Sequence, residues 1–225
     1  MKKFLVLIII LLSTSVLAHM DHYKKYNKIE MDILRNGEVI GYNYYFFSRK
    51  NNETIVTNQI KFSVKILGAT IFQVEGYGEE KYFRDQLISY NSKTLQNDKE
   101  KFVNLIFDKD KNKFIIKGSS YSGEASIDNV IGNWWNHKIL QADSQVSPIS
   151  GSIKKQVITF IGKKKIEQYG QTYEVDHFKL NPRDMSLPKD KRLDFNIWFD
   201  KKNSMIIRFS YSRMGNWEYR LKNSK

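Results

Sequence analysis

Histidines are the side chains best suited to metal or acid–base chemistry in this chain, which contains four of them and no cysteine. His19 would open the mature chain if a leader were removed before it, and an amino-terminal histidine can chelate copper through its amino group and ring. A second imidazole from His22, His137 or His177 would complete a three-nitrogen site. Because chain termini are usually frayed, we expect no metal ion and no cofactor here.

Carboxylates offer a second chemistry, the acid–base hydrolysis of glycosidic bonds. Two of them would have to lie within about 5–10 Å of each other. The candidates are Glu75, Glu79, Glu80 and Asp194. Asp176 and His177 are adjacent, so on a strand their side chains diverge and cannot form a relay by themselves. Without cysteine, thiol catalysis is excluded. The sequence thus favours a non-enzymatic role over a hydrolase that uses Glu80, His137 or His177.

Two adjacent tryptophans, Trp134 and Trp135, precede Asn136 and His137. Indole faces can stack on sugar rings or line the lip of a ligand cavity, although one indole could equally belong to the core. On a strand the two rings would point to opposite faces, whereas in a loop both could cover the mouth of a barrel. We expect an aromatic ligand site. The predicted ligand-binding residues are Tyr42, Tyr44, Phe72, Trp134 and Trp135.

The amino-terminal residues have the pattern of a secretory signal peptide. Lys2 and Lys3 precede the apolar run 4–12, and the small residues Val16 and Ala18 stand at the −3 and −1 positions of a cleavage site. We therefore expect residues 1–18 to be removed and residues 19–225 to form a single exported, periplasmic domain. No second apolar run follows, so we expect no transmembrane segment in the mature form.

Composition indicates a folded, basic protein. Aromatic residues make up 14% of the chain, which is untypical of disordered proteins. The formal net charge is +13, and many lysines fall in expected turns, around residues 109–113, 163–165 and 201–202. Lysines in turns are usually solvated surface. They could also touch an anionic surface, but no motif indicates nucleic acid as a partner.

Apolar and polar residues alternate with period two along most of the chain, which predicts strands. Asn36-Gly37 separates two such runs and predicts a hairpin with a type I′ turn. The predicted strands cover residues 29–33, 39–47, 54–67, 69–77, 80–90, 101–107, 113–117, 155–161, 171–180, 193–200, 205–212 and 217–221. Residues 119–152 fit neither period, apart from a short helix expected near 127–135, and are interpreted as a long crossover or cap.

About eleven strands without intervening helices predict an all-β fold, a single antiparallel meander. Because strongly twisted open sheets seldom exceed about 10 strands, the sheet should curl into an incomplete barrel or a strongly bent sheet. Such a fold can hold one small ligand on its concave face, here beneath the crossover.

The run from Ile29 to Phe47 resembles the opening hairpin of domain-of-unknown-function family 6134, a group of uncharacterised exported bacterial proteins. Further landmarks in the same order are Glu80 with Leu87, Thr94, Trp134 or Trp135, Ser150-Gly151 and residues 194–200. Members of this family often carry a histidine at the position of Asn43. Any role of that histidine is therefore not expected in this chain. The resemblance implies an exported β-rich domain and no particular activity.

These observations favour a binding module for an amphiphilic or apolar molecule of the cell envelope. Two alternatives remain at the level of the sequence. One is a hydrolase acting on envelope glycan, and the other is a structural or assembly factor that docks through an edge strand. The expected partner is therefore a lipid-like or glycan envelope ligand, and the oligomeric state is not predicted.

Overall fold

The computed structural model describes residues 19–188 and 192–225, so the predicted signal peptide lies outside the described residues. The fold is all-β, as predicted, with two short 3₁₀ helices, η1 (His19–Tyr23) and η2 (His137–Leu140). The first strands are β1 (Lys28–Arg35), β2 (Glu38–Lys50), β3 (Glu53–Ile66), β4 (Ala69–Phe83), β5 (Gln86–Gln96), β6 (Lys99–Asp108), β7 (Lys113–Gly118) and β8 (Ser122–Ser126). The remaining strands are β9 (Val130–Ile131), β10 (Ser144–Val146), β11 (Ile153–Gln168), β12 (Gln171–Pro182), β13 (Phe195–Asp200), β14 (Met205–Ser212) and β15 (Asn216–Ser224). Within the described residues, no helix has the length and apolarity needed to cross a bilayer.

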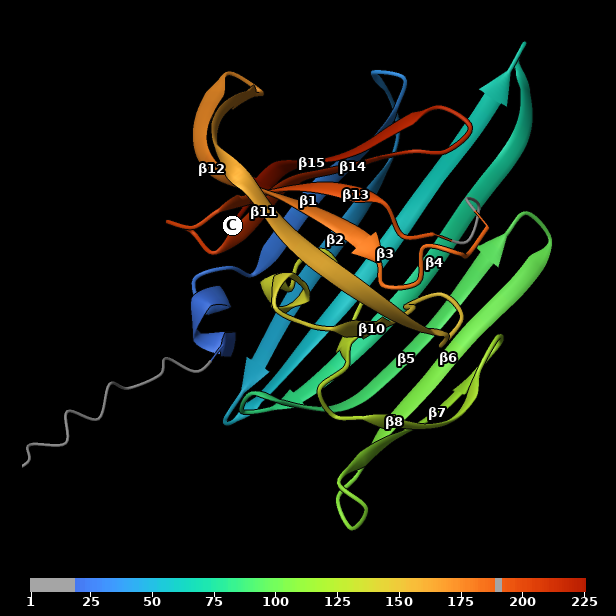
Figure 1. Ribbon diagram of the computed structural model, residues 1–225, viewed down its shortest axis with the longest axis vertical. Coiled ribbons are helices and arrows are strands. Elements are labelled where there is room, and N and C mark those ends of the chain that lie inside the picture. The colour runs from blue at the N-terminus through green and yellow to red at the C-terminus, as the bar shows by residue number, and fades with distance from the viewer. Residues whose placement is uncertain (1–18, 189–191) are drawn as a thin grey trace, which may run out of the picture.

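The strands form one 15-stranded sheet in which the first and last strands, β1 and β15, lie side by side at the centre. From this pair the chain runs outward as two antiparallel meanders, β1 to β8 on one side and β15 back to β10 on the other. Only β9 and β10 pair in parallel among the described strands. In Figure 1 the long strands β3 to β6 form one wall, and β11 to β15 curl across from the other side.

The two edges of the sheet, β8 and β9, are adjacent in sequence and are joined through loops rather than by strand pairing. The Ser120 amide donates to the carbonyl of Ser150 at 2.9 Å. A Cβ at Gly118 would lie 2.6 Å from the same carbonyl oxygen, so only glycine allows this approach. These contacts between the β7–β8 and β10–β11 loops close the curled sheet into an incomplete barrel.

The crossover contains more regular structure than the sequence predicted. Residues 119–152 include β8, β9 and β10, of five, two and three residues, so the fold has more strands than the eleven expected. The short helix predicted near 127–135 is wrong, because η2 begins at His137. Strands of two to five residues contain too few periods of alternation for the sequence pattern to reveal them.

The predicted opening hairpin is confirmed. Asn36 and Gly37 both have positive φ, 52° and 89°, as a type I′ turn requires. The β3–β4, β5–β6 and β14–β15 turns lie at the same end of the sheet as this turn, because the strands are antiparallel. We call this end the hairpin end (Figure 1).

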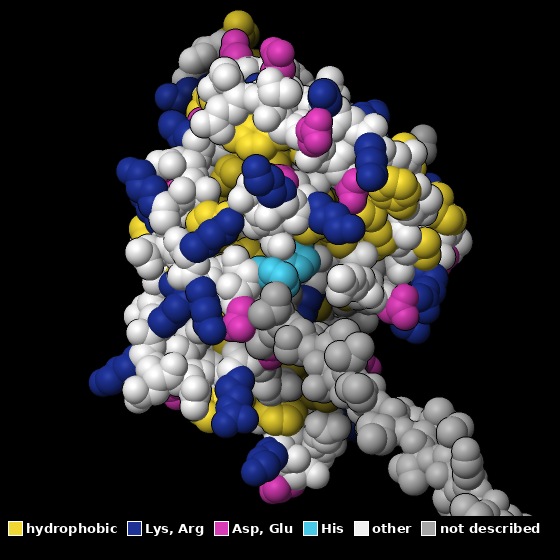
Figure 2. All heavy atoms as spheres, turned by 90° about the vertical axis from the view of Figure 1, so that its left-hand side faces the viewer, with side chains coloured by type: hydrophobic (Ala, Val, Ile, Leu, Met, Phe, Trp, Pro, Cys, Tyr) yellow, Lys and Arg dark blue, Asp and Glu magenta, His cyan; other side chains and the backbone are white. Residues whose placement is uncertain are grey.

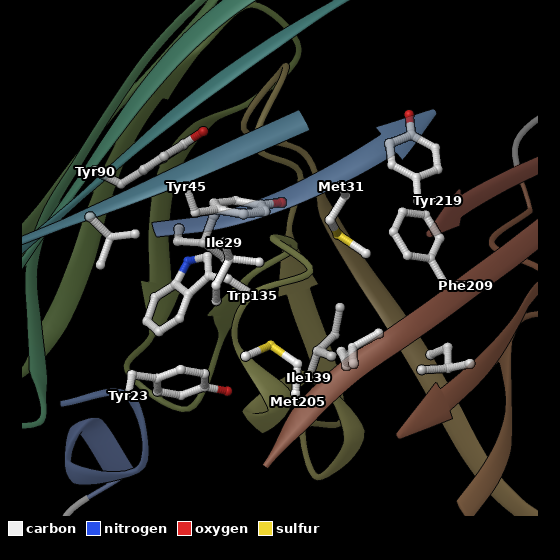
Figure 3. Packing of buried hydrophobic residues seen from close by; sticks show 14 of the residues in the cluster. Tyr23, Ile29, Met31, Tyr45, Tyr90, Trp135, Ile139, Met205, Phe209 and Tyr219 are labelled. Carbon is white, nitrogen blue, oxygen red and sulfur yellow. The ribbon is translucent and has the colours of Figure 1, made fainter. Parts of the chain in front are cut away.

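The opposite end of the barrel is filled by aromatic side chains that pack around Trp135, which is fully buried. The Tyr23 ring of η1 and the Phe47 ring lie edge-on to the indole, at centroid distances of 4.9 and 5.3 Å. Figure 3 shows Trp135 between Tyr23 and Tyr45. Large buried rings contribute strongly to core stability, so this layer plugs the barrel.

Candidate ligand-binding cavity

A cavity of about 720 Å³ occupies the interior of the curled sheet between the aromatic plug and the hairpin end. Its volume falls within the roughly 300–1,000 Å³ typical of small-molecule sites. Apolar side chains form most of the wall because alternate residues of β3 and β4 point inward. The wall residues are Ile60, Phe62, Val64, Ile71, Phe72, Val74, Trp134, Ile149 and Trp217.

The inner end of the cavity is polar, and its groups are hydrogen-bonded to one another. Asn43 donates to the Tyr45 hydroxyl at 2.8 Å, and the Trp134 amide contacts the same oxygen at 3.2 Å. The hydroxyls of Tyr90 and Ser92 both donate to the carbonyl of Pro148, at 2.9 and 2.7 Å. Burial raises the pKa of Tyr45 and Tyr90, so both remain neutral phenols.

The charged residues that line the cavity are all cationic. Arg35, Lys101 and Arg213 lie near the hairpin end, and none of the ion pairs among the described residues involves them. Arg35 donates from Nε and Nη2 to the carbonyl of Met214, at 3.2 and 2.6 Å. No aspartate, glutamate or histidine lines the cavity among the residues that the structure describes. The mouth therefore favours an anionic group.

Two of the five predicted ligand-binding residues line the cavity. Phe72 forms part of the β4 wall, and Trp134 enters from the crossover. The Trp134 indole is held in place by stacking on Phe209, with ring centroids 3.8 Å apart. Trp135 lies in the plug instead, and its indole N–H donates to Glu80 at 2.8 Å. The adjacent tryptophans thus divide between the cavity and the core.

Tyr42 and Tyr44 do not line the cavity. Their neighbours Asn43 and Tyr45 do, and side chains of a strand alternate between faces, so the two tyrosines lie on the outer face of β2. There the two rings stack with centroids 4.4 Å apart. Both faces of β2 carry aromatic residues, so the period-two pattern alone does not distinguish the inside from the outside.

Glu80 is buried within the plug and does not line the cavity. Asn133 Nδ2 donates to Oε1 at 2.6 Å, and the Trp135 indole donates to the same oxygen. The Tyr82 hydroxyl donates to Oε2. Burial raises the pKa of Glu80, and these three donors oppose the rise because they stabilise the carboxylate. Glu80 therefore has a structural role, because its hydrogen bonds join β4 to Asn133 and Trp135 of the crossover.

The histidines are likewise engaged outside the cavity. His137 Nδ1 lies 2.6 Å from the Tyr23 hydroxyl, and burial lowers the pKa of His137 to about 4. His177 Nε2 lies 3.1 Å from Asn196 Oδ1, and its ring stacks on Trp198. Among the described residues, no three histidine, aspartate or glutamate side chains come together as a metal site. The side chain of His19, the first candidate copper ligand, is not among those described.

The polar inner end and the cationic mouth were not predicted from the sequence. Asn43, Tyr45 and Tyr90 come from β2 and β5, and Arg35 and Arg213 flank turns. For the polar inner end, the only signal in the sequence is the alternation along β2, which places Asn43 and Tyr45 on the same face of the strand. The arginines converge through strand pairing that places the β1–β2 and β14–β15 turns together, which local sequence does not encode.

Similarity to known proteins is found at the level of the family and of the fold. The family model described as "Domain of unknown function (DUF6134)" matches residues 31–222. A β-barrel-like protein of the domain of unknown function DUF1849 from Brucella abortus superposes with a TM-score of 0.57 at 8% identity, covering 88% of this chain and 95% of that one. A DUF1329 family protein from Desulfovibrio piger gives a TM-score of 0.27 at 10% identity, covering 92% and 88%. No curated protein matches.

Proposed function

The chain belongs to the DUF6134 family of domains of unknown function, and we propose that it is an exported protein that binds one amphiphilic molecule of the cell envelope. The observation that carries this proposal is the cavity of about 720 Å³, whose walls are apolar and whose charged lining residues are all cationic. The apolar part of the ligand lies against the walls, and its anionic head group lies at the mouth.

The apolar walls supply the affinity. Each methylene group transferred from water to such a surface stabilises the complex by about 0.8 kcal/mol. The polar inner end adds orientation, because Tyr45 and Tyr90 present hydroxyls whose neighbours already satisfy them. A ligand that covers these two residues therefore leaves neither hydroxyl oxygen unpaired.

The two alternative functions find less support. Hydrolysis of glycan requires an acid or base that touches the substrate, but the residues considered for this role, Glu80, His137 and His177, lie outside the cavity lining. Docking through an edge strand requires an open edge of useful length. Here the edge strands β8 and β9 have five and two residues.

A titration with dansylaminoundecanoic acid, an anionic amphiphile, tests the proposal on the mature chain. We expect saturable binding of one probe per protein, with energy transfer from Trp134 and Trp217, whose side chains line the cavity. The uncharged amide of the same probe should bind more weakly. Non-saturable binding, or no energy transfer, would contradict the proposal.

A matched pair of variants locates the site. Ile60→Trp places a larger side chain in the cavity and should clearly weaken saturable binding. Ile106→Trp makes the same change on β6 at a side chain that is 61% exposed, and it should bind like the parent. Both variants are first checked for an unchanged melting midpoint. Equal probe binding by the two variants would place the ligand elsewhere.

A further inference from the structure

Two tight turns at the hairpin end carry apolar side chains in a backbone conformation that favours asparagine or glycine. Leu67, in the β3–β4 turn, has φ of 49° and a fully exposed side chain. Met214, in the β14–β15 turn, has φ of 50° and is 87% exposed. At the same end, the equivalent positions of two other turns are Asn36 and Asn97. Neither burial nor backbone preference explains Leu67 and Met214.

These two turns flank the mouth of the cavity. Met214 and Arg35 both line the cavity, and the hydrogen bonds from Arg35 hold the Met214 carbonyl in place. The Asn36 amide donates to the carbonyl of Asn216 at 2.7 Å, which ties the β1–β2 turn to the β14–β15 turn. The β3–β4 turn follows Val64, another lining residue. In Figure 1 the three hairpins project together from this end of the sheet.

Further exposed apolar side chains lie beside the two tips. We call the set the apolar rim. Its members are Val39, Ile66, Leu67, Ile71 and Met214, of which Ile71 and Met214 also line the cavity. Single exposed apolar residues are ordinary on protein surfaces, but a group of them at one site marks an interaction surface.

Cationic side chains accompany the apolar rim. They are Arg35, Lys65, Lys99, Lys101 and Arg213, and none of them takes part in an ion pair among the described residues. A groove contains Arg35 and Lys65 together with Val39 of the rim and the acidic Glu38. Asp98 and Glu100 are the other acidic residues near the β5–β6 turn, and Glu100 pairs with Lys93.

Charge alone does not single out this surface. On the face that carries η1, Lys and Arg side chains are scattered over the whole view (Figure 2). The hairpin end differs because strained, fully exposed apolar tips and cations occur together. Apolar side chains that enter the acyl region, with cations at head-group level, are the pattern by which proteins bind anionic bilayer surfaces.

We propose that the apolar rim docks the mouth of the cavity on an anionic lipid bilayer. Leu67 and Met214 insert between the lipids, and the neighbouring cations contact the head groups. The cavity then opens directly onto the membrane. This goes beyond the binding of an amphiphile, since it states where the ligand enters and leaves: between bilayer and cavity, without crossing water.

Flotation with vesicles tests the docking surface. The mature chain should bind phosphatidylcholine vesicles that contain phosphatidylglycerol, bind pure phosphatidylcholine more weakly, and lose affinity as salt rises. Leu67→Asn should lower partitioning about tenfold, because the leucine no longer transfers from water to lipid. Asparagine suits the turn, so folding is preserved. Ile106→Asn changes an exposed isoleucine near the other end of β6 and should partition like the parent.

A second variant gives a direct readout. The emission of Leu67→Trp should shift to the blue on addition of anionic vesicles, because the indole leaves water. Equal partitioning of Leu67→Asn and the parent, or an unshifted Leu67→Trp emission, would overturn the proposal. A dimer in analytical ultracentrifugation that Leu67→Asn abolishes would assign the rim to a second copy of the chain instead.

The dansyl titration separates this proposal from the proposed function. Leu67 does not line the cavity, so Leu67→Asn should bind the probe with the affinity of the parent. If the parent docks on vesicles but binds no probe, only the proposed function fails. If it binds the probe but docks on no vesicle, only the docking surface fails.

Discussion

Glu80 shows how a single buried carboxyl group can organise the interior. Its carboxylate accepts hydrogen bonds from Asn133 and Trp135 of the crossover and from Tyr82 of its own strand. A buried carboxylate is tolerated only where such donors replace water. Glu80 thereby holds the crossover against β4, and the crossover in turn presents Trp134 to the cavity.

This arrangement predicts a pH-dependent stability difference between the parent and Glu80→Gln. Because the pKa of Glu80 is raised above 4.5 in the folded state, its contribution is fully present below pH 4.5 and is lost as pH rises towards the folded-state pKa. The free energy of unfolding of the parent, relative to Glu80→Gln, should fall by up to about 1.4 kcal/mol per pH unit in that window. Urea unfolding at pH 4 to 8 measures it, and a constant difference would contradict the raised pKa.

The cationic mouth predicts a charge-dependent affinity. Arg213→Gln should weaken binding of the anionic dansyl probe about two- to fivefold, as expected for an exposed charge. Binding of the uncharged amide should not change. Lys109→Gln, in the turn between β6 and β7 at the far end of the sheet, is the matched control. An Arg213→Gln variant that binds the anionic probe like the parent at low salt would remove the mouth from the recognition of the ligand.

At the scale of elements, the opening hairpin is the feature that local sequence specifies best. Gly37 has φ of 89°, and a Cβ there would meet no atom within 4 Å, so the strain of a substitution is purely conformational. Gly37→Val should cost about 1–3 kcal/mol of unfolding free energy. Gly37→Asn should cost clearly less, because asparagine tolerates positive φ. Equal melting midpoints for the two variants would show that the turn is not conformationally demanding.

Elements that depend on distant partners could not be predicted in the same way. The long strands are visible in the alternation of apolar and polar residues. In contrast, β9 has only two residues and is defined by its pairing with Gln145 and Val146 of β10. By residue type, Tyr42 and Tyr44 look as suited to the interior as Tyr45, although only Tyr45 lines the cavity. Which face is inside follows from the direction in which the whole sheet curls, and this is a property of the complete chain.

At the scale of the whole molecule, the number of strands and the lack of long helices were enough to predict a curled antiparallel sheet. The pairing of β1 with β15 was not predictable, and neither was the closure through Gly118 and Ser150. These contacts join residues far apart in sequence.

The proposed function requires that the protein is exported. The basic start, the short apolar run and the small residues before His19 predict that residues 1–18 are removed. Amino-terminal sequencing of the protein recovered from the periplasm should therefore begin at His19. A periplasmic protein that begins at Met1, or a protein confined to the cytoplasm, would contradict the prediction.

Native mass spectrometry of the protein purified from its own cell envelope tests the central claim most directly. The parent and Ile106→Trp should each carry one bound molecule of matching mass, released on denaturation and identified as an anionic amphiphile. Ile60→Trp, whose larger side chain enters the ligand space, should carry clearly less of it. A parent protein that carries no adduct, or an adduct that Ile60→Trp retains in full, would contradict the assignment of the cavity as the ligand site.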